Sequence, residues 1–300
     1  MVRFTHILYP TDLSDAAAPG LGYALSLARW YQARLTVLHV VPTFEAVPMP
    51  PGAIGELTHL LYPPPKDAVL AEIRRALDLD ALTDITPDVQ VVEGDASPAI
   101  LDRALTTKAD LVVMGTHGRR GFDRLLHGSV TGRVLQRASC PVLTVPPHAV
   151  PAPHDPIFTR ILCPIDFSPA SQQAYGFALD LASQSNGAVT ALHVVDWLAE
   201  GDPVEVAAYN AEEYRQYVLS DAETRLRTFA EAEPHDWCDV VPTVRSGRSH
   251  RAILQVATDM SANLIVMGAH GRGALGTAIY GSTAHEVIRA AACPVLVVRG

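Results

Sequence analysis

Residues 109–118 have the sequence ADLVVMGTHG, and residues 262–271 have the closely similar sequence ANLIVMGAHG. Each stretch is an apolar, β-branched run that ends in a Gly-x-x-Gly loop, and a Gly-Ser pair follows nine residues after each loop. An apolar run bounded by glycine predicts a strand that is covered on both faces. Glycine directly after such a strand lets the chain turn tightly and lets an anion approach main-chain N–H groups with no Cβ in the way.

The similarity extends along the chain, which repeats itself at an offset of about 153 residues. Residues 109–145 and 262–298 share 17 identities in 37 positions without a gap, and residues 4–16 match residues 158–170 at 8 of 13 positions. A proline-rich stretch without periodicity lies between the repeats. We therefore predict two domains, at 1–147 and 157–300, joined by a linker at 148–156. The 300 residues suffice for two such domains.

Each half alternates apolar runs with helical patterns, which predicts an α/β fold with a parallel sheet and helices on both faces. The first half has expected strands near 4–9, 35–41, 88–93, 110–114 and 141–145, and expected helices near 14–33, 66–82, 97–108 and 126–138. The second half has expected strands near 159–163, 188–195, 239–245, 263–267 and 294–298. Serine is the expected helix N-cap at Ser14, Ser97, Ser168 and Ser249.

Composition and charge exclude several classes of function. The chain carries 23 basic and 32 acidic residues, a net charge of −9, which argues against a nucleic-acid partner held through phosphate neutralisation. No apolar run approaches the roughly 18 residues of a membrane span. The first residues show no apolar segment of an export signal, so we expect a cytoplasmic protein. The four cysteines occur singly, without zinc-ligand spacing, and are expected to be buried reduced thiols.

Open parallel sheets bind ligands beyond the carboxyl ends of their strands, where the strand order reverses. The candidate ligand-binding residues are therefore those that follow the first and fourth strands of each half. In the first half these are Asp12, Gly115, Gly118, Gly128 and Ser129. In the second half they are Asp166, Gly268, Gly271, Gly281 and Ser282.

The chemistry of these residues favours a nucleotide. Main-chain N–H groups of the glycine loop and of the following helix start suit phosphates. A carboxylate repels phosphate, but it can accept hydrogen bonds from the hydroxyls of a ribose or the amino edge of a base. The alternative is a duplicated structural loop, with each aspartate serving only to cap the helix that follows it.

The complete pattern, present in both halves, resembles that of the universal stress protein family over nearly the whole chain. Membership would imply two tandem Rossmann-like domains of the adenine nucleotide alpha hydrolase-like type, each a five-stranded parallel sheet of order 3-2-1-4-5, with ATP at the strand ends. By this resemblance, adenosine would contact Asp12 and Val41 in the first half and Asp166 and Val195 in the second. The glycines and serines named above would contact the ribose and phosphates, and Met114 and Met267 would line the same wall.

The two halves differ around the expected pocket. The first glycine loop is followed by Arg119 and Arg120, and the second by Arg272 alone. Such arginines would either bind phosphate or be solvated. The segment from Pro42 to Pro65 holds seven prolines, which suits a cover, a partner-binding loop or a plain surface excursion. The corresponding part of the second half, Val204 to Glu233, is predicted to contain a long helix.

The sequence does not predict fast nucleotide chemistry. The P-loop pattern GxxxxGK is absent, and His117 and His270 are the general-base candidates near the phosphates, although a role in fixing the loop is preferred. We expect an ATP-binding regulatory or stress-response protein with at most slow ATPase activity, and Mg²⁺ would arrive bound mainly by phosphate oxygens. The alternatives are a nucleotide-using hydrolase and a partner-binding protein with empty pockets, whose protein partner the sequence does not name.

The last strand of each half, near 142–145 and 295–298, would be an apolar sheet edge. By the family resemblance, these two edges are expected to meet inside one chain as a pseudo-dimer. A further homodimer is left open by the sequence.

Overall fold

The computed structural model describes residues 1–43, 66–116, 130–150, 152, 158–195, 211–233, 237–269 and 281–299. Several sequence-based predictions lie outside these residues. They concern most of the proline-rich segment, the arginines beside the glycine loops, the loop histidines His117 and His270, and most of the linker. Nothing below bears on those predictions.

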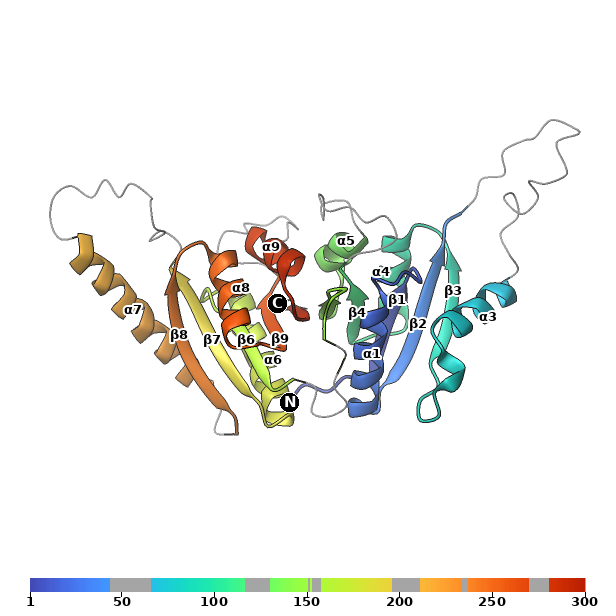
Figure 1. The fold of residues 1–300 in the computed structure, drawn as a ribbon, viewed down its shortest axis with the longest axis horizontal. Coiled ribbons are helices and arrows are strands. Elements are labelled where there is room, and N and C mark those ends of the chain that lie inside the picture. Colours follow the sequence, from blue (N-terminus) through green and yellow to red (C-terminus); the bar gives the residue numbers. More distant parts are fainter. Residues whose placement is uncertain are drawn as a thin grey trace, which may run out of the picture.

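Strands and helices alternate along the described chain, as the sequence pattern predicts (Figure 1). The first half contains β1 (His6–Thr11), α1 (Ala18–Tyr31), β2 (Arg34–Val41), α3 (Lys66–Ala76), the short 3₁₀ turn η1 (Leu79–Ala81), β3 (Asp88–Glu93), α4 (Ala96–Thr106), β4 (Leu111–Gly115), α5 (Val130–Arg137) and β5 (Val142–Val145). The second half contains β6 (Arg160–Pro164), α6 (Pro169–Gln184), β7 (Ala188–Val195), α7 (Ala211–Glu231), β8 (Asp239–Ser246), α8 (Ser249–Asp259), β9 (Leu264–Gly268), α9 (Ser282–Ala290) and β10 (Val295–Val298).

The strands form one ten-stranded sheet in the order β3-β2-β1-β4-β5-β10-β9-β6-β7-β8. Each half is parallel and has the order 3-2-1-4-5, which confirms the predicted fold class. The two halves meet where β5 pairs with β10 antiparallel, with Leu143 opposite Leu296. The expected apolar edge strands therefore pair with each other within the chain, at the centre of the molecule (Figure 1).

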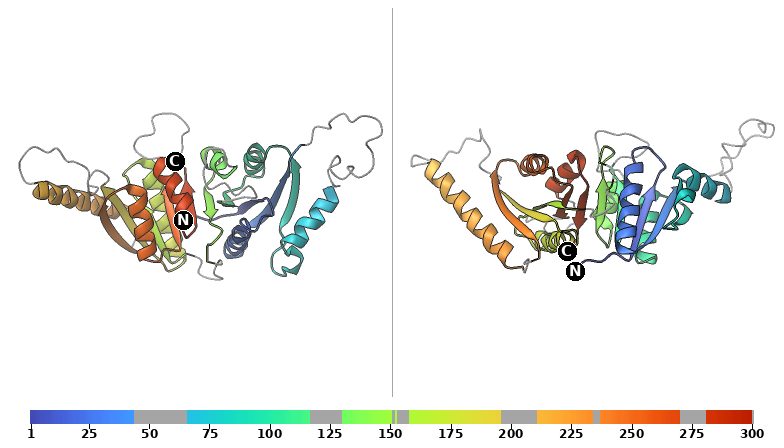
Figure 2. Two further views of the ribbon diagram at one scale, coloured as in Figure 1. Left: turned by 45° about the horizontal axis from the view of Figure 1, so that its top comes forward. Right: turned by 60° about the horizontal axis from the view of Figure 1, so that its bottom comes forward.

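Helices cover both faces of the sheet, so all the strands except the edge strand β8 contribute side chains to two cores (Figure 2). Along β1, Ile7 and Tyr9 belong to the core under α1 and α6, and Leu8 belongs to the core under α4 and α8. All three side chains are fully buried. This two-sided burial explains why the strands have continuous apolar runs in place of an alternating pattern.

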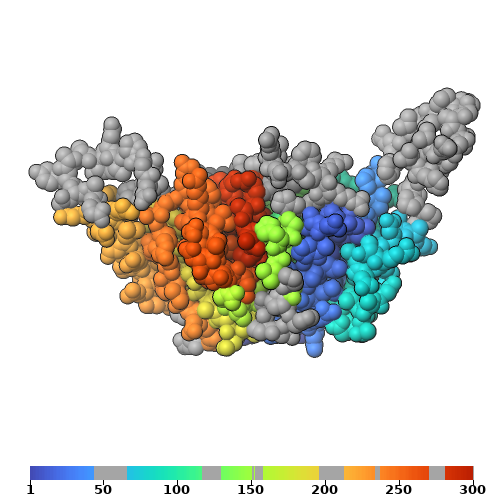
Figure 3. All heavy atoms as spheres, in the orientation of Figure 1, coloured from blue at the N-terminus to red at the C-terminus, as the bar shows by residue number. Residues whose placement is uncertain are grey.

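Contacts outside the sheet also join the two halves. The main chain of Val2 donates to the Asp180 carboxylate at 2.7 Å and accepts from the Gln184 side chain at 2.8 Å. At the pairing of β5 with β10, the buried Thr144 hydroxyl donates to the Val295 carbonyl at 3.1 Å. In Figure 3 the green atoms around β5 lie directly against the red atoms of the C-terminal segment.

One of the four predicted serine caps is confirmed. Ser168 is the N-cap of α6 and accepts from the main chain of Ser171. The predictions for Ser97 and Ser249 are wrong, because each lies inside its helix and the N-caps are Asp95 and Arg248.

The prediction that Ser14 caps α1 is also wrong, because the helix begins four residues later, at Ala18. Pro19 has no N–H to donate to the carbonyl of Asp15, and its ring would clash with that carbonyl inside a helix. A helix that began directly after Ser14 would therefore be interrupted. Pro19 lies instead in the first turn of α1, where a proline is tolerated.

The cysteines are free thiols, of which Cys140, Cys163 and Cys293 are buried as expected and Cys238 is half-buried. Burial raises the pKa of Cys140 to about 11 and that of Cys293 to about 11. Burial likewise raises the pKa of the Tyr9 hydroxyl, which donates to the Ala17 carbonyl, to about 12. These groups are stable in the folded protein as neutral, protonated side chains.

We expect the free energy of unfolding to fall as the pH rises from about 9 toward 11. A raised pKa in the folded state means that the unfolded chain loses its thiol protons first, so the stabilisation is complete below pH 9 and is lost above it. The loss is on the order of 2 kcal/mol for each of Cys140 and Cys293. Urea unfolding at pH 8 and pH 10.5 measures it. The double variant Cys140→Ala, Cys293→Ala should show a shallower pH dependence, and an unchanged dependence would contradict the assignment.

Candidate functional site

The carboxyl ends of β1 and β6 carry the same aspartate turn. Oδ1 of Asp12 accepts from the main-chain N–H of Ser14 at 3.1 Å and from its hydroxyl at 2.6 Å. Oδ1 of Asp166 accepts from the main-chain N–H of Ser168 at 3.0 Å and from its hydroxyl at 2.6 Å. Both halves therefore hold the carboxylate in one orientation. These bonds give each aspartate a structural role in its turn. Neither aspartate is the cap that the alternative interpretation expects, because the N-caps of α1 and α6 are Ala17 and Ser168.

The residue after each aspartate has a left-handed backbone, with φ of 61° at Leu13 and 62° at Phe167. This conformation costs a non-glycine residue about 1–2 kcal/mol relative to the right-handed region. The cost occurs at the same place in both halves. The same duplication occurs at two pairs of helix ends, Gln32 with Asn186 and Lys108 with Ser261, so the left-handed residue is a feature of the repeated fold.

The next strand end along the sheet supplies Val41 in the first half and Val195 in the second. The carbonyl of Val41 accepts from the N–H of Gly94 at 2.9 Å, and the carbonyl of Val195 accepts from the N–H of Gly247 at 3.2 Å. Both glycines have positive φ, 141° and 130°, which an L side chain rarely adopts. Gly94 and Gly247 therefore shape this edge of the site, although the sequence analysis did not identify them.

Gly115 and Gly268 are the last residues of β4 and β9, the strands next to β1 and β6. At Gly268 the chain has no room for a side chain, because a Cβ would lie 2.9 Å from the carbonyl carbon of Ala170 and 3.0 Å from its oxygen. Ala170 is in the first turn of α6, directly after the Asp166 turn. Gly268 thus lets the helix start and the aspartate turn lie close to the end of β9.

Gly268→Ala should lower the free energy of unfolding by about 1–3 kcal/mol, because the added methyl group forces α6 away from β9. Chemical denaturation measures the change. Gly176→Ala is the matched control, because it lies inside α6 with no atom near its Cβ position. That control should stabilise the protein by about 0.5–1 kcal/mol. Equal effects of the two substitutions would show that the close approach at Gly268 carries no strain.

Met114 and Met267 precede these glycines, and each is only 5% exposed. Both belong to the core under α4, α5, α8 and α9. Their side chains are thus packed as core residues beside the predicted site.

In the second half the predicted Gly-Ser helix start is present. Gly281 is the N-cap of α9 and Ser282 is the first helical residue, and no side chain caps the helix. The N–H of Gly281 donates to the carbonyl of Ala269 at 3.3 Å, which brings the start of α9 to the end of β9. N–H groups of a first helical turn without a side-chain cap suit an anion.

In the first half α5 begins at Val130. The remaining predicted phosphate contacts lie outside the described residues. They are Gly118, Gly128, Ser129 and Gly271.

The sheet order brings the described parts of each site together at the carboxyl ends of the strands. Strand β1 lies between β2 and β4, so Asp12, Val41 and Gly115 stand at the same ends of three neighbouring strands. The same holds for Asp166, Val195 and Gly268, because β6 lies between β7 and β9. Each edge therefore combines a fixed carboxylate with main-chain groups at glycines.

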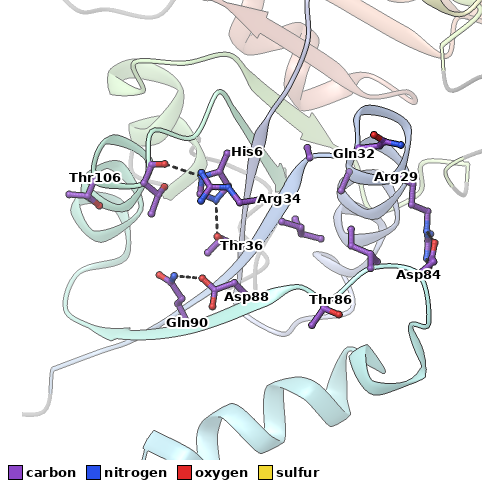
Figure 4. A pocket seen from close by; sticks show the side chains of 15 residues that line it. His6, Arg29, Gln32, Arg34, Thr36, Asp84, Thr86, Asp88, Gln90 and Thr106 are labelled. Atoms are coloured by element: carbon purple, nitrogen blue, oxygen red, sulfur yellow. Dashed lines mark hydrogen bonds and ion pairs between the residues drawn. The ribbon is translucent and has the colours of Figure 1, made fainter.

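A cavity of about 900 Å³ lies at the opposite ends of the first-half strands, lined by His6, Arg34, Thr36 and Asp88 among others (Figure 4). Its histidine is fully engaged, because Nδ1 of His6 lies 3.0 Å from the Thr107 carbonyl and Nε2 lies 2.8 Å from the Thr36 hydroxyl. These bonds satisfy a buried core histidine. The ligand-binding residues predicted from the sequence lie at the carboxyl ends of the strands, away from this cavity.

Among the described residues, no cluster of three or more histidine, cysteine or acidic side chains could hold a metal ion. None of the described helices is both long enough and apolar enough to span a bilayer.

The doubly wound halves, with matching candidate sites at their strand ends, define an α/β protein built from two tandem domains of the same fold. The family model of the universal stress protein family matches residues 3–146 and again residues 158–299. The chain therefore belongs to the universal stress protein family, as a tandem member.

Individual relatives agree with this assignment. A universal stress protein of Mycolicibacterium smegmatis is 29% identical over 298 residues, which cover 98% of this chain and 96% of the relative. Universal stress protein Rv2005c of Mycobacterium tuberculosis is 33% identical over 195 residues, which cover 65% of this chain and 63% of the relative. The match thus spans less than two thirds of that relative. The crystal structure of a universal stress protein from Archaeoglobus fulgidus has the same fold, with a TM-score of 0.67, 24% identity and coverage of 99% and 97% of the two chains.

Proposed function

We propose that this chain binds an adenine nucleotide, with ATP as the ligand, at the strand-end site of each half, and that it acts as a nucleotide-dependent regulatory protein of the stress response. The observation that supports this most is the duplicated aspartate turn. Two strand ends, 154 positions apart in the sequence, hold Asp12 and Asp166 by the same two bonds from a serine. Neighbouring strand ends place glycines beside both.

In this proposal the chain's own groups have separate tasks. Asp12 and Asp166 accept from ribose hydroxyls or from the amino group of the base. The glycine loops and the uncapped start of α9 offer N–H groups to the phosphates. When ATP is bound, Mg²⁺ would be held mainly by the phosphate oxygens. The sequence has no GxxxxGK pattern to supply a P-loop lysine, which favours hydrolysis that is at most slow.

Isothermal titration of nucleotide-free protein with ATP tests the proposal. We expect two molecules of ATP per chain, and mass spectrometry of nucleotide released from freshly purified protein identifies the natural ligand. No measurable heat and no released nucleotide would favour a partner-binding protein with empty sites. A turnover above about one cycle per second, which is within the ordinary enzyme range, would favour a nucleotide hydrolase.

A further inference from the structure

The same histidine contact occurs beside both aspartate turns. Nδ1 of His39 on β2 lies 2.8 Å from the carbonyl oxygen of Thr11, and Nδ1 of His193 on β7 lies 2.7 Å from the carbonyl oxygen of Ile165. A carbonyl oxygen can only accept, so Nδ1 carries the hydrogen in both contacts. Each bond therefore selects the tautomer with the proton on Nδ1 when the ring is neutral.

These carbonyls belong to the peptides that join Thr11 to Asp12 and Ile165 to Asp166. A peptide unit is planar, so a bond to its oxygen also fixes the orientation of the N–H on the aspartate. The chain leaves the strand at this point and enters the left-handed turn at Leu13 or Phe167. His39 lies opposite Thr11 in the strand register, so its side chain supplies a donor where the regular strand pairing ends.

The two halves support this contact differently. In the second half, the Phe167 ring packs on the His193 ring with centroids 4.6 Å apart, and the guanidinium of Arg225 from α7 lies 4.7 Å from the Phe167 centroid. In the first half, the Thr11 hydroxyl accepts from the N–H of Leu13 at 3.1 Å. The histidine contact, like the bonds from serine to the aspartate, is common to both turns.

We infer that His39 and His193 are positioning residues of the two nucleotide sites: each fixes the peptide before the aspartate, and thereby the place of the carboxylate that meets the ligand. This inference rests on the proposed nucleotide binding. The histidines act through the main chain and need no contact with the nucleotide.

Substitutions that keep or remove the donor test the inference by ATP titration of the full chain. His39→Leu should weaken binding at the first site about five- to tenfold, which is the usual worth of one such hydrogen bond. His39→Asn should restore most of the affinity, because the asparagine amide nitrogen takes nearly the place of Nδ1. His193→Leu and His193→Asn should have the same effects at the second site, and in each single variant the untouched site is the internal reference.

His6→Leu is the matched control in the same half. His6 makes the same kind of Nδ1 contact to a carbonyl, but at the opposite end of β1. Its loss should lower stability and leave the affinity for ATP unchanged. If His6→Leu weakens ATP binding as much as His39→Leu does, the effect is general destabilisation and the inference fails.

The tautomer of each histidine can be measured without nucleotide and so tests the inference independently of binding. Nitrogen-15 NMR of the nucleotide-free protein at pH 8 should show Nδ1 protonated in His39 and His193, and protonation on Nε2 would overturn the inference. Should His39→Leu not fold, His39→Gln takes its place, because its amide lies one bond further out and should not restore affinity. Unchanged affinity in the folded leucine variants overturns the inference while the proposed function stands. Absence of ATP binding by the wild-type chain overturns both.

Discussion

The double variant Gly118→Val, Gly128→Val should bind one ATP per chain where the wild-type chain binds two. Valine at these positions places a branched side chain where the phosphates are proposed to meet bare main-chain N–H groups. We expect the affinity of the first site to fall by at least about 100-fold, equivalent to about 2.7 kcal/mol of binding free energy. Calorimetric stoichiometry measures the change, and two ATP molecules per chain in this variant would contradict the placement of the site.

The reciprocal variant Gly271→Val, Gly281→Val is the control for this result and should remove the second site alone. At Gly281 the backbone has φ of −61° and ψ of 137°, a conformation that valine adopts without strain. Backbone strain at Gly281 would therefore not account for a loss of binding in this variant. Urea unfolding of both variants should stay close to that of the wild type, which separates blocked binding from unfolding.

The strand positions could be predicted because they depend on burial, whereas the order of the strands in the sheet was implied by the family resemblance. Residues such as Leu8 and Tyr9 are buried on opposite faces, so the apolar run extends through β1 without alternation. Helix starts were predicted less well, because they depend on single residues. Pro19 moves the start of α1 away from Ser14, whereas in the second half Gln173, 154 positions further on, allows α6 to begin directly after Ser168.

The candidate site could be predicted in part. Asp12 and Asp166 were found because an acidic residue directly after a first strand can be recognised in the sequence, and because the aspartate is repeated in both halves. The histidines that bond the peptides before these aspartates were not found, because the contact between His39 and Thr11 depends on the register of two strands whose paired residues are 28 positions apart. A signal was nevertheless present, since His39 and His193 repeat at the same offset as the aspartates, and Gly94 and Gly247 repeat at 153 positions.

Pairing at the apolar edge strands was expected, and the family resemblance implied that the two edges meet within one chain, but the additional contacts between the halves were not expected. Val2 contacts Asp180 and Gln184 across 178 and 182 positions. Nothing in the sequence near Val2 predicts this contact, because a short polar terminus has no periodicity. The register of β5 against β10 likewise depends on how the two completed half-sheets approach each other.

Leu143→Ala should lower the free energy of unfolding by about 2–5 kcal/mol, and Leu296→Ala should have an effect of similar size. These side chains are 1% and 2% exposed and lie opposite each other where β5 pairs with β10, so each truncation leaves a cavity at the seam between the halves. Because the two residues are register partners, the loss of unfolding free energy in the double variant should differ from the sum of the two single losses by about 0.5–3 kcal/mol. Urea unfolding of the wild type, the two single variants and the double variant gives this coupling.

Leu105→Ala is the control, because Leu105 is 66% exposed on α4 and its truncation should change stability by no more than about 0.5 kcal/mol. Strictly additive losses at Leu143 and Leu296 would mean that this pair provides no energetic coupling between the two halves. The continuous ten-stranded sheet would then not be the unit that unfolds.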